Sequence, residues 1–162
     1  MLVGAVRSNA SLWTCDSGDR NVAQVAFEVH TRLSPQRVMS MLTDFSPQRP
    51  ELWPNLAREL YCVHKIAGTS ADVQEGSLWP TLMWERDHYD WSVAGRVRWT
   101  VRESNYSKPG SYVQVIVQEA SLGGSRVHVE WNRTGIGLKG KTLIGLHGGG
   151  ELCRTLVAGR SP

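Results

Sequence analysis

Long apolar runs and cysteine pairs are both missing from this chain of 162 residues. No window approaches the roughly 18–20 consecutive apolar residues that a membrane-spanning helix needs. The first residues hold one short apolar run with no basic segment before it, so we expect no signal peptide. The cysteines, Cys15, Cys62 and Cys153, are odd in number and widely spaced, which favours neither a disulfide framework nor a zinc site. We therefore expect a cytoplasmic protein without integral membrane contact, metal or cofactor.

Concentrated positive charge is missing as well. The formal net charge is only +3, and the lysines and arginines are scattered along the chain. A nucleic-acid partner would need a clustered basic surface, so we expect none. With 41% hydrophobic and 20% charged residues the chain is of ordinary globular composition. We expect a loose leader over 1–20, one domain over 21–158 and a short tail over 159–162, as a monomer or homodimer.

What the chain does have is a period-two alternation of apolar and polar residues. This alternation is typical of half-buried strands. Glycine-bearing turns separate several of these segments, which indicates hairpins, and each strand has one apolar face. An antiparallel sheet covered on one side is therefore expected. The predicted strands are 22–31, 59–68, 71–77, 82–91, 95–104, 111–120 and 125–133.

Two short helices are expected between the first two strands. Ser34 can cap a helix whose first residue is Pro35, and Leu33 and Val38 are spaced for a hydrophobic staple. Three prolines in residues 45–56 leave room for only a short, broken second helix.

The tail after the last strand is the remaining candidate to cover the sheet. Its apolar and small residues recur at helical spacing, so we predict a helix over 138–157, with a possible break at 148–150. It is a poor helix by propensity, because seven of the 16 glycines lie between Gly135 and Gly150.

Residues 135–142, GIGLKGKT, match the phosphate-binding loop of nucleotide hydrolases. That loop works at the end of a buried parallel strand, and a further strand must supply a magnesium-binding aspartate. Here the preceding strands have antiparallel patterns, and only 20 residues follow Thr142. We therefore expect a strand-to-helix junction, with Lys141 at the surface or at a cavity mouth. Magnesium-dependent nucleotide binding that Lys141→Ala abolishes would contradict this interpretation.

Three stretches of sequence carry a family resemblance. They are VAFEVHTRLSPQRVMSMLTDFSPQRPELWPNL, the WERDHYDW strand, and SRVHVEWNRTG running into the last helix. With the order strand, two helices, six strands and helix, they resemble the START-like (SRPBCC) superfamily, in its polyketide cyclase/dehydrase and lipid-transport branch. The resemblance implies an α+β helix-grip fold, in which a curved antiparallel sheet of about seven strands wraps round a long C-terminal helix. It also implies an apolar cavity that binds lipids, sterols or polyketides, where a minority of members catalyse cyclisation, aromatisation or dehydration.

The inward positions of such a sheet supply the candidate ligand-binding residues. Gly145 and Gly149, if they face the sheet, would leave volume for a ligand, although they could equally permit close packing or break the helix. The predicted lining residues are Phe27, Tyr89, Trp99, Val115, Trp131, Gly145 and Gly149.

The densest ionisable cluster is ERDHYD, residues 85–90. If His88 points inward, it is a candidate general base that Asp90 or Arg86 would orient. If Tyr89 points inward, the pocket is apolar with one hydroxyl, and the charged residues form a solvated outer face. The apolar alternation favours the second arrangement.

Three hypotheses about function stay open at this point. The first is a carrier or sensor of a hydrophobic small molecule. The second is a cyclase, aromatase or dehydratase in which His88 or Tyr89 transfers protons. The third is an interaction module whose own side chains fill the cavity.

Overall fold

Seven antiparallel strands form one sheet in the computed structural model, which describes residues 22–53 and 55–146. The order across the sheet is β1-β7-β6-β5-β4-β3-β2, so every neighbour except β1–β7 is also adjacent in sequence. The strands are β1 (Val22–Thr31), β2 (Cys62–Ala67), β3 (Ser70–Ser77), β4 (Met83–Asp90), β5 (Arg96–Ser104), β6 (Tyr112–Glu119) and β7 (Ser125–Thr134).

The predicted strands are confirmed, and one boundary differs by more than a single residue. The strand expected over 59–68 begins only at Cys62, because Arg58–Leu60 form a single 3-10 turn. In that turn the backbone N–H of Tyr61 donates to the carbonyl of Arg58, which a strand conformation would not allow.

The alternation seen in the sequence separates the two faces of the sheet. Val115 lies opposite Val97 on one side and Val129 on the other, and all three side chains are buried. Between them, polar residues such as Gln114 point to the other face and stay partly exposed. Burying this row of valines stabilises the sheet by about 1.5–3 kcal/mol per side chain.

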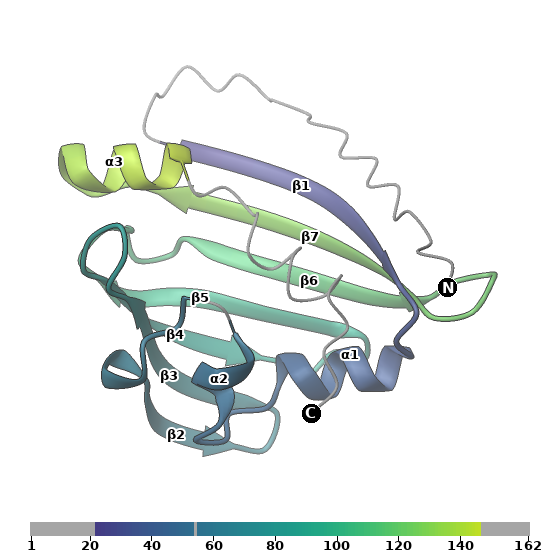
Figure 1. Ribbon diagram of the computed structural model, residues 1–162. Coiled ribbons are helices and arrows are strands. Elements are labelled where there is room, and N and C mark those ends of the chain that lie inside the picture. Colours follow the sequence, from purple (N-terminus) through teal and green to yellow (C-terminus); the bar gives the residue numbers. More distant parts are fainter. Residues whose placement is uncertain (1–21, 54, 147–162) are drawn as a thin grey trace, which may run out of the picture.

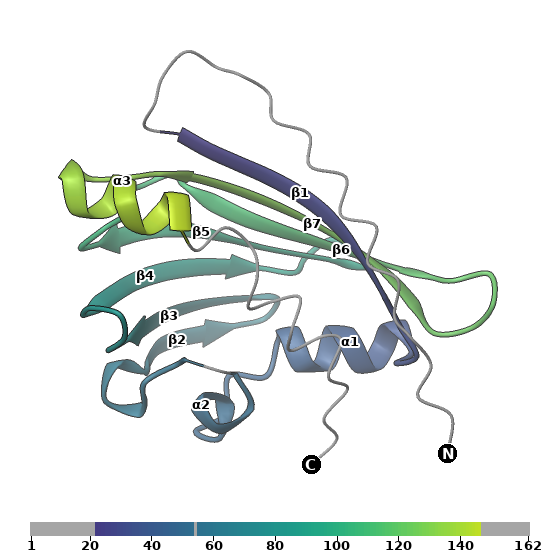
Figure 2. The ribbon, with the colours of Figure 1, turned by 45° about the horizontal axis from the view of Figure 1, so that its top comes forward.

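Helices α1 (Pro35–Leu42) and α2 (Arg49–Leu52) form in the predicted places. The Ser34 hydroxyl accepts the backbone N–H of Arg37 at 3.3 Å, which caps α1. Val38 and Leu42 are the buried face of α1. The sheet is curved, and its concave face carries these helices together with α3 (Gly137–Leu146) (Figures 1 and 2).

The glycine-rich string GIGLKGKT forms the junction between β7 and α3, as predicted. A Cβ atom at Gly140 would lie 2.2 Å from the carbonyl oxygen of Tyr106, and one at Gly135 would lie 2.6 Å from the carbonyl carbon of Gly140. Gly140 therefore allows the start of α3 to pack against the backbone of the β5–β6 loop, and Gly135 allows the chain before α3 to pack against the first turn of that helix. Lys141 is exposed.

The described part of α3 ends at Leu146, and the expected continuation to residue 157 lies outside the described residues. α3 packs against β7 and β1 at one end of the sheet. No helix in residues 22–53 and 55–146 is long and apolar enough to cross a membrane.

Candidate functional site

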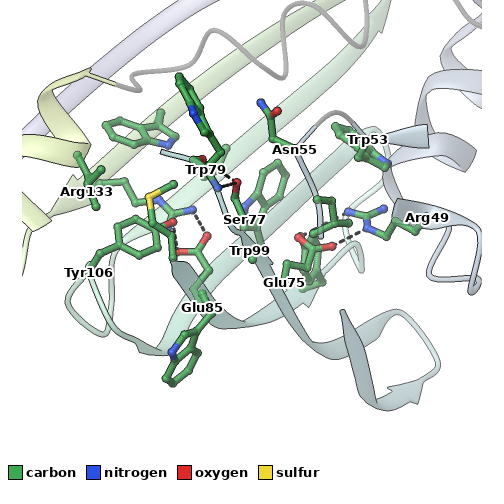
Figure 3. Close-up of a pocket in the computed structure, with 18 of the residues that line it drawn as sticks. Arg49, Trp53, Asn55, Glu75, Ser77, Trp79, Glu85, Trp99, Tyr106 and Arg133 are labelled. Atoms are coloured by element: carbon green, nitrogen blue, oxygen red, sulfur yellow. Dashed lines mark hydrogen bonds and ion pairs between the residues drawn. The ribbon is translucent and has the colours of Figure 1, made fainter. Parts of the chain in front are cut away.

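A cavity of about 260 Å³ lies between the concave face of the sheet and the helices (Figure 3). Its aromatic lining residues are Trp53, Trp79, Trp84, Trp99, Trp131, Tyr89 and Tyr106. Its aliphatic lining residues are Leu42, Leu56, Met83, Val113, Val129 and Leu143. Its polar and charged lining residues are Arg49, Asn55, Glu75, Ser77, Glu85 and Arg133. A mainly apolar wall with a few placed polar groups is typical of small-molecule sites.

The first of two charged groups in the wall joins α2 to the sheet. Arg49 Nε donates to Glu75 Oε1 at 2.6 Å, and the Tyr89 hydroxyl donates to Glu75 Oε2 at 2.8 Å. Arg49 Nη1 also donates to the backbone carbonyl of Asp44 at 2.9 Å. The Arg49 side chain is only 5% exposed, so this ion pair is shielded from solvent (Figure 3).

Aromatic rings surround the Arg49 guanidinium. Its central carbon lies 4.9 Å from the centre of the Phe45 ring and 5.0 Å from that of Trp53, within cation–π range. Burial lowers the pKa of Arg49, but the charge of Glu75, the nearby Tyr89 and the hydrogen bond to Glu75 together outweigh burial, so the pKa ends above its ordinary value. Burial, and then the Glu75 charge, raise the pKa of Tyr89 well above the ordinary value. The Tyr89 hydroxyl therefore stays protonated and donates a hydrogen bond to Glu75.

The second charged group lies nearer α3. Arg133 uses both terminal nitrogens to bind both carboxylate oxygens of Glu85, with Nη2 to Oε1 at 2.7 Å. The Tyr106 hydroxyl donates to Glu85 Oε2 at 2.9 Å. Burial, and then the Glu85 charge, raise the pKa of Tyr106 well above its ordinary value. Such bidentate hydrogen bonding is the strongest form of arginine–carboxylate pairing.

A third acid, Asp87, lies beside this pair, next to Glu85. It is 1% exposed, and in its protonated form it shares a hydrogen bond with Glu85. Burial, and then the charge of Glu85, raise the pKa of Asp87 well above the ordinary value. The carboxyl group is therefore neutral at lower pH and ionises only as the pH rises through this raised pKa.

Three of the predicted lining residues are on the wall of the cavity: Tyr89, Trp99 and Trp131. Phe27 and Val115 are not among the described lining residues. Val115 is fully buried in the core, which Phe27 packs against. The cavity occupies the end of the sheet where β6 begins, so Val113 lines it rather than Val115.

The two glycines proposed to create cavity volume remain a prediction. Gly145 lies in α3, and Gly149 is outside the described residues.

The two catalytic candidates are placed on opposite faces of β4. Tyr89 is buried and lines the cavity, whereas His88 is on the outer face, with Nδ1 2.9 Å from Asp72 Oδ1. The hydrogen bond to His88 lowers the pKa of Asp72. In residues 22–53 and 55–146, no three histidine, cysteine or acidic side chains are grouped closely enough to hold a metal ion.

One expectation about this strand is wrong. With Tyr89 inward, the charged residues of 85–90 were expected to face solvent, but Glu85 and Asp87 share the buried face of Tyr89. They are tolerated there because Arg133 neutralises Glu85, and because Asp87 sheds its charge by keeping a proton.

No local sequence signal shows these pairings. Glu85 is 48 residues from Arg133 in sequence, and Glu75 is 26 residues from Arg49. One signal was available. Glu85 and Asp87 alternate along β4 in phase with the inward Tyr89, and acids buried in this way require buried cations from elsewhere in the chain.

The chain is similar to known proteins in structure but not detectably in sequence. No protein-family model matches the chain, and no curated protein matches it in sequence. Solved structures do match. A Thermus thermophilus protein is 16% identical with a TM-score of 0.60, covering 76% of this chain and 83% of its own.

Two further structures extend the likeness. A START superfamily protein from Mycobacterium smegmatis is 11% identical with a TM-score of 0.61, over 75% of this chain and 86% of its own. The Zhui aromatase/cyclase from a Streptomyces species is 10% identical with a TM-score of 0.56, and the match covers 71% of this chain and 68% of the aromatase/cyclase. At such low identities the likeness shows the fold alone. The chain therefore has the START-like (SRPBCC) helix-grip fold that its sequence resembles.

Proposed function

We propose that the cavity binds a small, neutral, mainly apolar molecule and that the chain acts as its carrier or sensor. The observation that carries this proposal is the composition of the wall. Five tryptophan and two tyrosine side chains among the described residues surround about 260 Å³. Aromatic rings supply large apolar contact area while their N–H and O–H groups can bond polar atoms of a ligand.

The charges in the wall support a neutral ligand over an anionic one. The two cations that line the cavity, Arg49 and Arg133, are each already paired with a glutamate. A fatty-acid carboxylate would have to displace Glu75 or Glu85 and leave a buried anion uncompensated, which costs several kcal/mol. A hydroxyl or carbonyl group could instead bond to the wall without breaking either pair.

The volume of the cavity limits the size of the ligand. Its volume of about 260 Å³ lies just below the range of about 300–1,000 Å³ found for drug-sized ligands. Together with the ring-lined wall, this favours a compact ring compound, such as a polyketide-like aromatic, over an extended acyl chain or a full sterol. The likeness to a START superfamily protein and to an aromatase/cyclase also supports a small organic ligand.

Tryptophan fluorescence tests the proposal directly. We expect saturable quenching when the chain is titrated with a neutral aromatic alcohol, and an affinity about tenfold weaker in Trp99→Ala, because that ring is part of the wall. Trp91→Phe is the matched control, since Trp91 packs against Phe45 in the core and is not among the described lining residues. If no neutral apolar compound gives a saturable change, the cavity does not bind ligand and the proposal fails.

A second candidate function is a dehydratase or cyclase in the same cavity. The observation that favours it is an acid and a hydroxyl together in the wall, since the Tyr106 hydroxyl donates to Glu85 at 2.9 Å and both residues line the cavity. In a dehydration, a base removes a proton next to a carbonyl while an acid protonates the departing hydroxyl, which leaves as water. Turnover of a β-hydroxy ketone that Tyr106→Phe abolishes and Tyr112→Phe preserves would decide for catalysis. Binding without turnover would decide for the carrier.

A further inference from the structure

Exposed apolar side chains gather at the mouth of the cavity. In the loop between β3 and β4, Leu78 is 57% exposed, Trp79 75% and Leu82 47%, and Trp79 also lines the cavity. At the start of α3, Ile136 is 41% exposed and Leu138 83%. We refer to these five residues as the mouth patch.

Hydrogen bonds hold the parts of the mouth patch together. The carbonyl oxygen of Leu82 accepts from Asn105 Nδ2 at 3.0 Å and from Lys139 Nζ at 2.9 Å. The backbone N–H of Ile136 donates to the carbonyl of Tyr106 at 2.9 Å. The β3–β4 loop, the β5–β6 loop and the start of α3 therefore form one continuous surface.

The three segments that carry and adjoin the mouth patch have charge of a single sign. Residues 76–84, 104–111 and 134–146 contain no aspartate or glutamate. The charged residues of these three segments are exposed lysines, namely Lys108, Lys139 and Lys141. Within these three segments, exposed apolar side chains are therefore accompanied by cations alone, and such a surface is complementary to one that is apolar inside and anionic outside.

We propose that the mouth patch docks on the surface of an anionic lipid bilayer. The aliphatic side chains and Trp79 enter the headgroup region, which tryptophan favours, and the lysines contact lipid phosphates. A lipid surface fits better than a protein partner because Trp79 belongs both to the mouth patch and to the cavity wall. An apolar ligand could then pass between bilayer and cavity without crossing water. The passage of a ligand rests on the proposed function, whereas docking on the bilayer does not.

Co-sedimentation of the full chain with lipid vesicles tests the proposal. We expect binding to vesicles enriched in phosphatidylglycerol, little binding to phosphatidylcholine alone, and weakening by salt. Lys141→Gln should lower vesicle affinity about fivefold, and Leu138→Ser about tenfold. The matched controls are Lys65→Gln, in exposed β2, and Leu122→Ser, which is 99% exposed in the β6–β7 turn at the other end of β7 (Figure 1).

Several results would overturn the docking. These are absence of sedimentation with anionic vesicles, or equal losses in Leu122→Ser and Leu138→Ser. A dimer in solution that Leu138→Ser dissociates, without vesicle binding, would assign the mouth patch to a second copy of the chain. Ligand titration without vesicles separates this proposal from the previous one, because Leu138 and Lys141 are not among the described lining residues. Vesicle binding without ligand binding would refute the proposed function alone.

Discussion

At the scale of single residues, Arg49 and Arg133 determine the polarity of the cavity. Each is almost fully buried, and each is paired with a glutamate from another element of the fold. Removing two charges from water costs several kcal/mol per ion, and the paired hydrogen bonds offset that cost only while both partners are present. Loss of one partner should therefore be far more damaging than loss of an exposed charge.

Glu85→Gln tests this dependence. The substitution leaves the Arg133 guanidinium buried without a counter-charge, so the free energy of unfolding should fall by about 3–5 kcal/mol. Urea denaturation measures the change. Glu51→Gln is the control, because Glu51 pairs with Arg58 at the surface, where such pairs contribute about 1 kcal/mol or less. Equal effects at Glu85 and Glu51 would show that the Arg133 pair is not a buried one in solution.

Asp87 gives a pH-dependent prediction. Its pKa is raised in the folded chain, whereas in the unfolded chain it titrates near its ordinary value of about 4. Between these two values unfolding releases a proton, so rising pH favours the unfolded state. Asp87→Asn removes this term, and its stability relative to the parent should increase as the pH rises from about 4 towards 7. A difference that stays constant over this range would mean that Asp87 is ionised in the fold.

At the scale of elements, local patterns predicted most of what forms. Period-two alternation identified all seven strands, and the Ser34–Pro35 pair marked the start of α1, because in both cases neighbouring residues decide the structure. The start of β2 was missed since the backbone hydrogen bond of Tyr61 to Arg58 replaces a strand conformation there. Residues 135–142 were predicted as a strand-to-helix junction, but the close approach of Gly140 to the backbone of Tyr106 was not.

Gly140→Ala tests the role of that junction. The new Cβ would lie 2.2 Å from the backbone carbonyl oxygen of Tyr106, which cannot move aside as a flexible side chain would. We expect a loss of about 1–3 kcal/mol in the free energy of unfolding. Ligand affinity should also weaken, because Leu143 and Tyr106 line the cavity next to the displaced turn. Lys141→Ala, at an exposed position of the same helix, should change neither quantity by more than about 0.5 kcal/mol. Equal effects of the two substitutions would show that the close contact is not needed.

At the scale of the whole molecule, a one-sided sheet explains why a cavity exists. The helices on the concave face do not fill the space in front of Trp99 and Trp131, and about 260 Å³ remains. The family resemblance implied that space, and the sequence predicted Tyr89, Trp99 and Trp131 in its wall but not Trp53, Trp79 or Trp84. It could not predict the charged groups in the wall, because the partners Arg49–Glu75 and Arg133–Glu85 meet only when distant strands and helices come together.

Calorimetric titration with a matched pair of ligands tests the central claim most directly. A neutral aromatic alcohol and the carboxylate of the same ring skeleton differ in charge but hardly in size. We predict that the alcohol binds with a negative heat-capacity change, as burial of apolar surface requires. The carboxylate should bind at least tenfold more weakly, because both cations of the cavity are already paired. Equal or tighter binding of the carboxylate, or no binding of either compound, would contradict a cavity built for neutral apolar ligands.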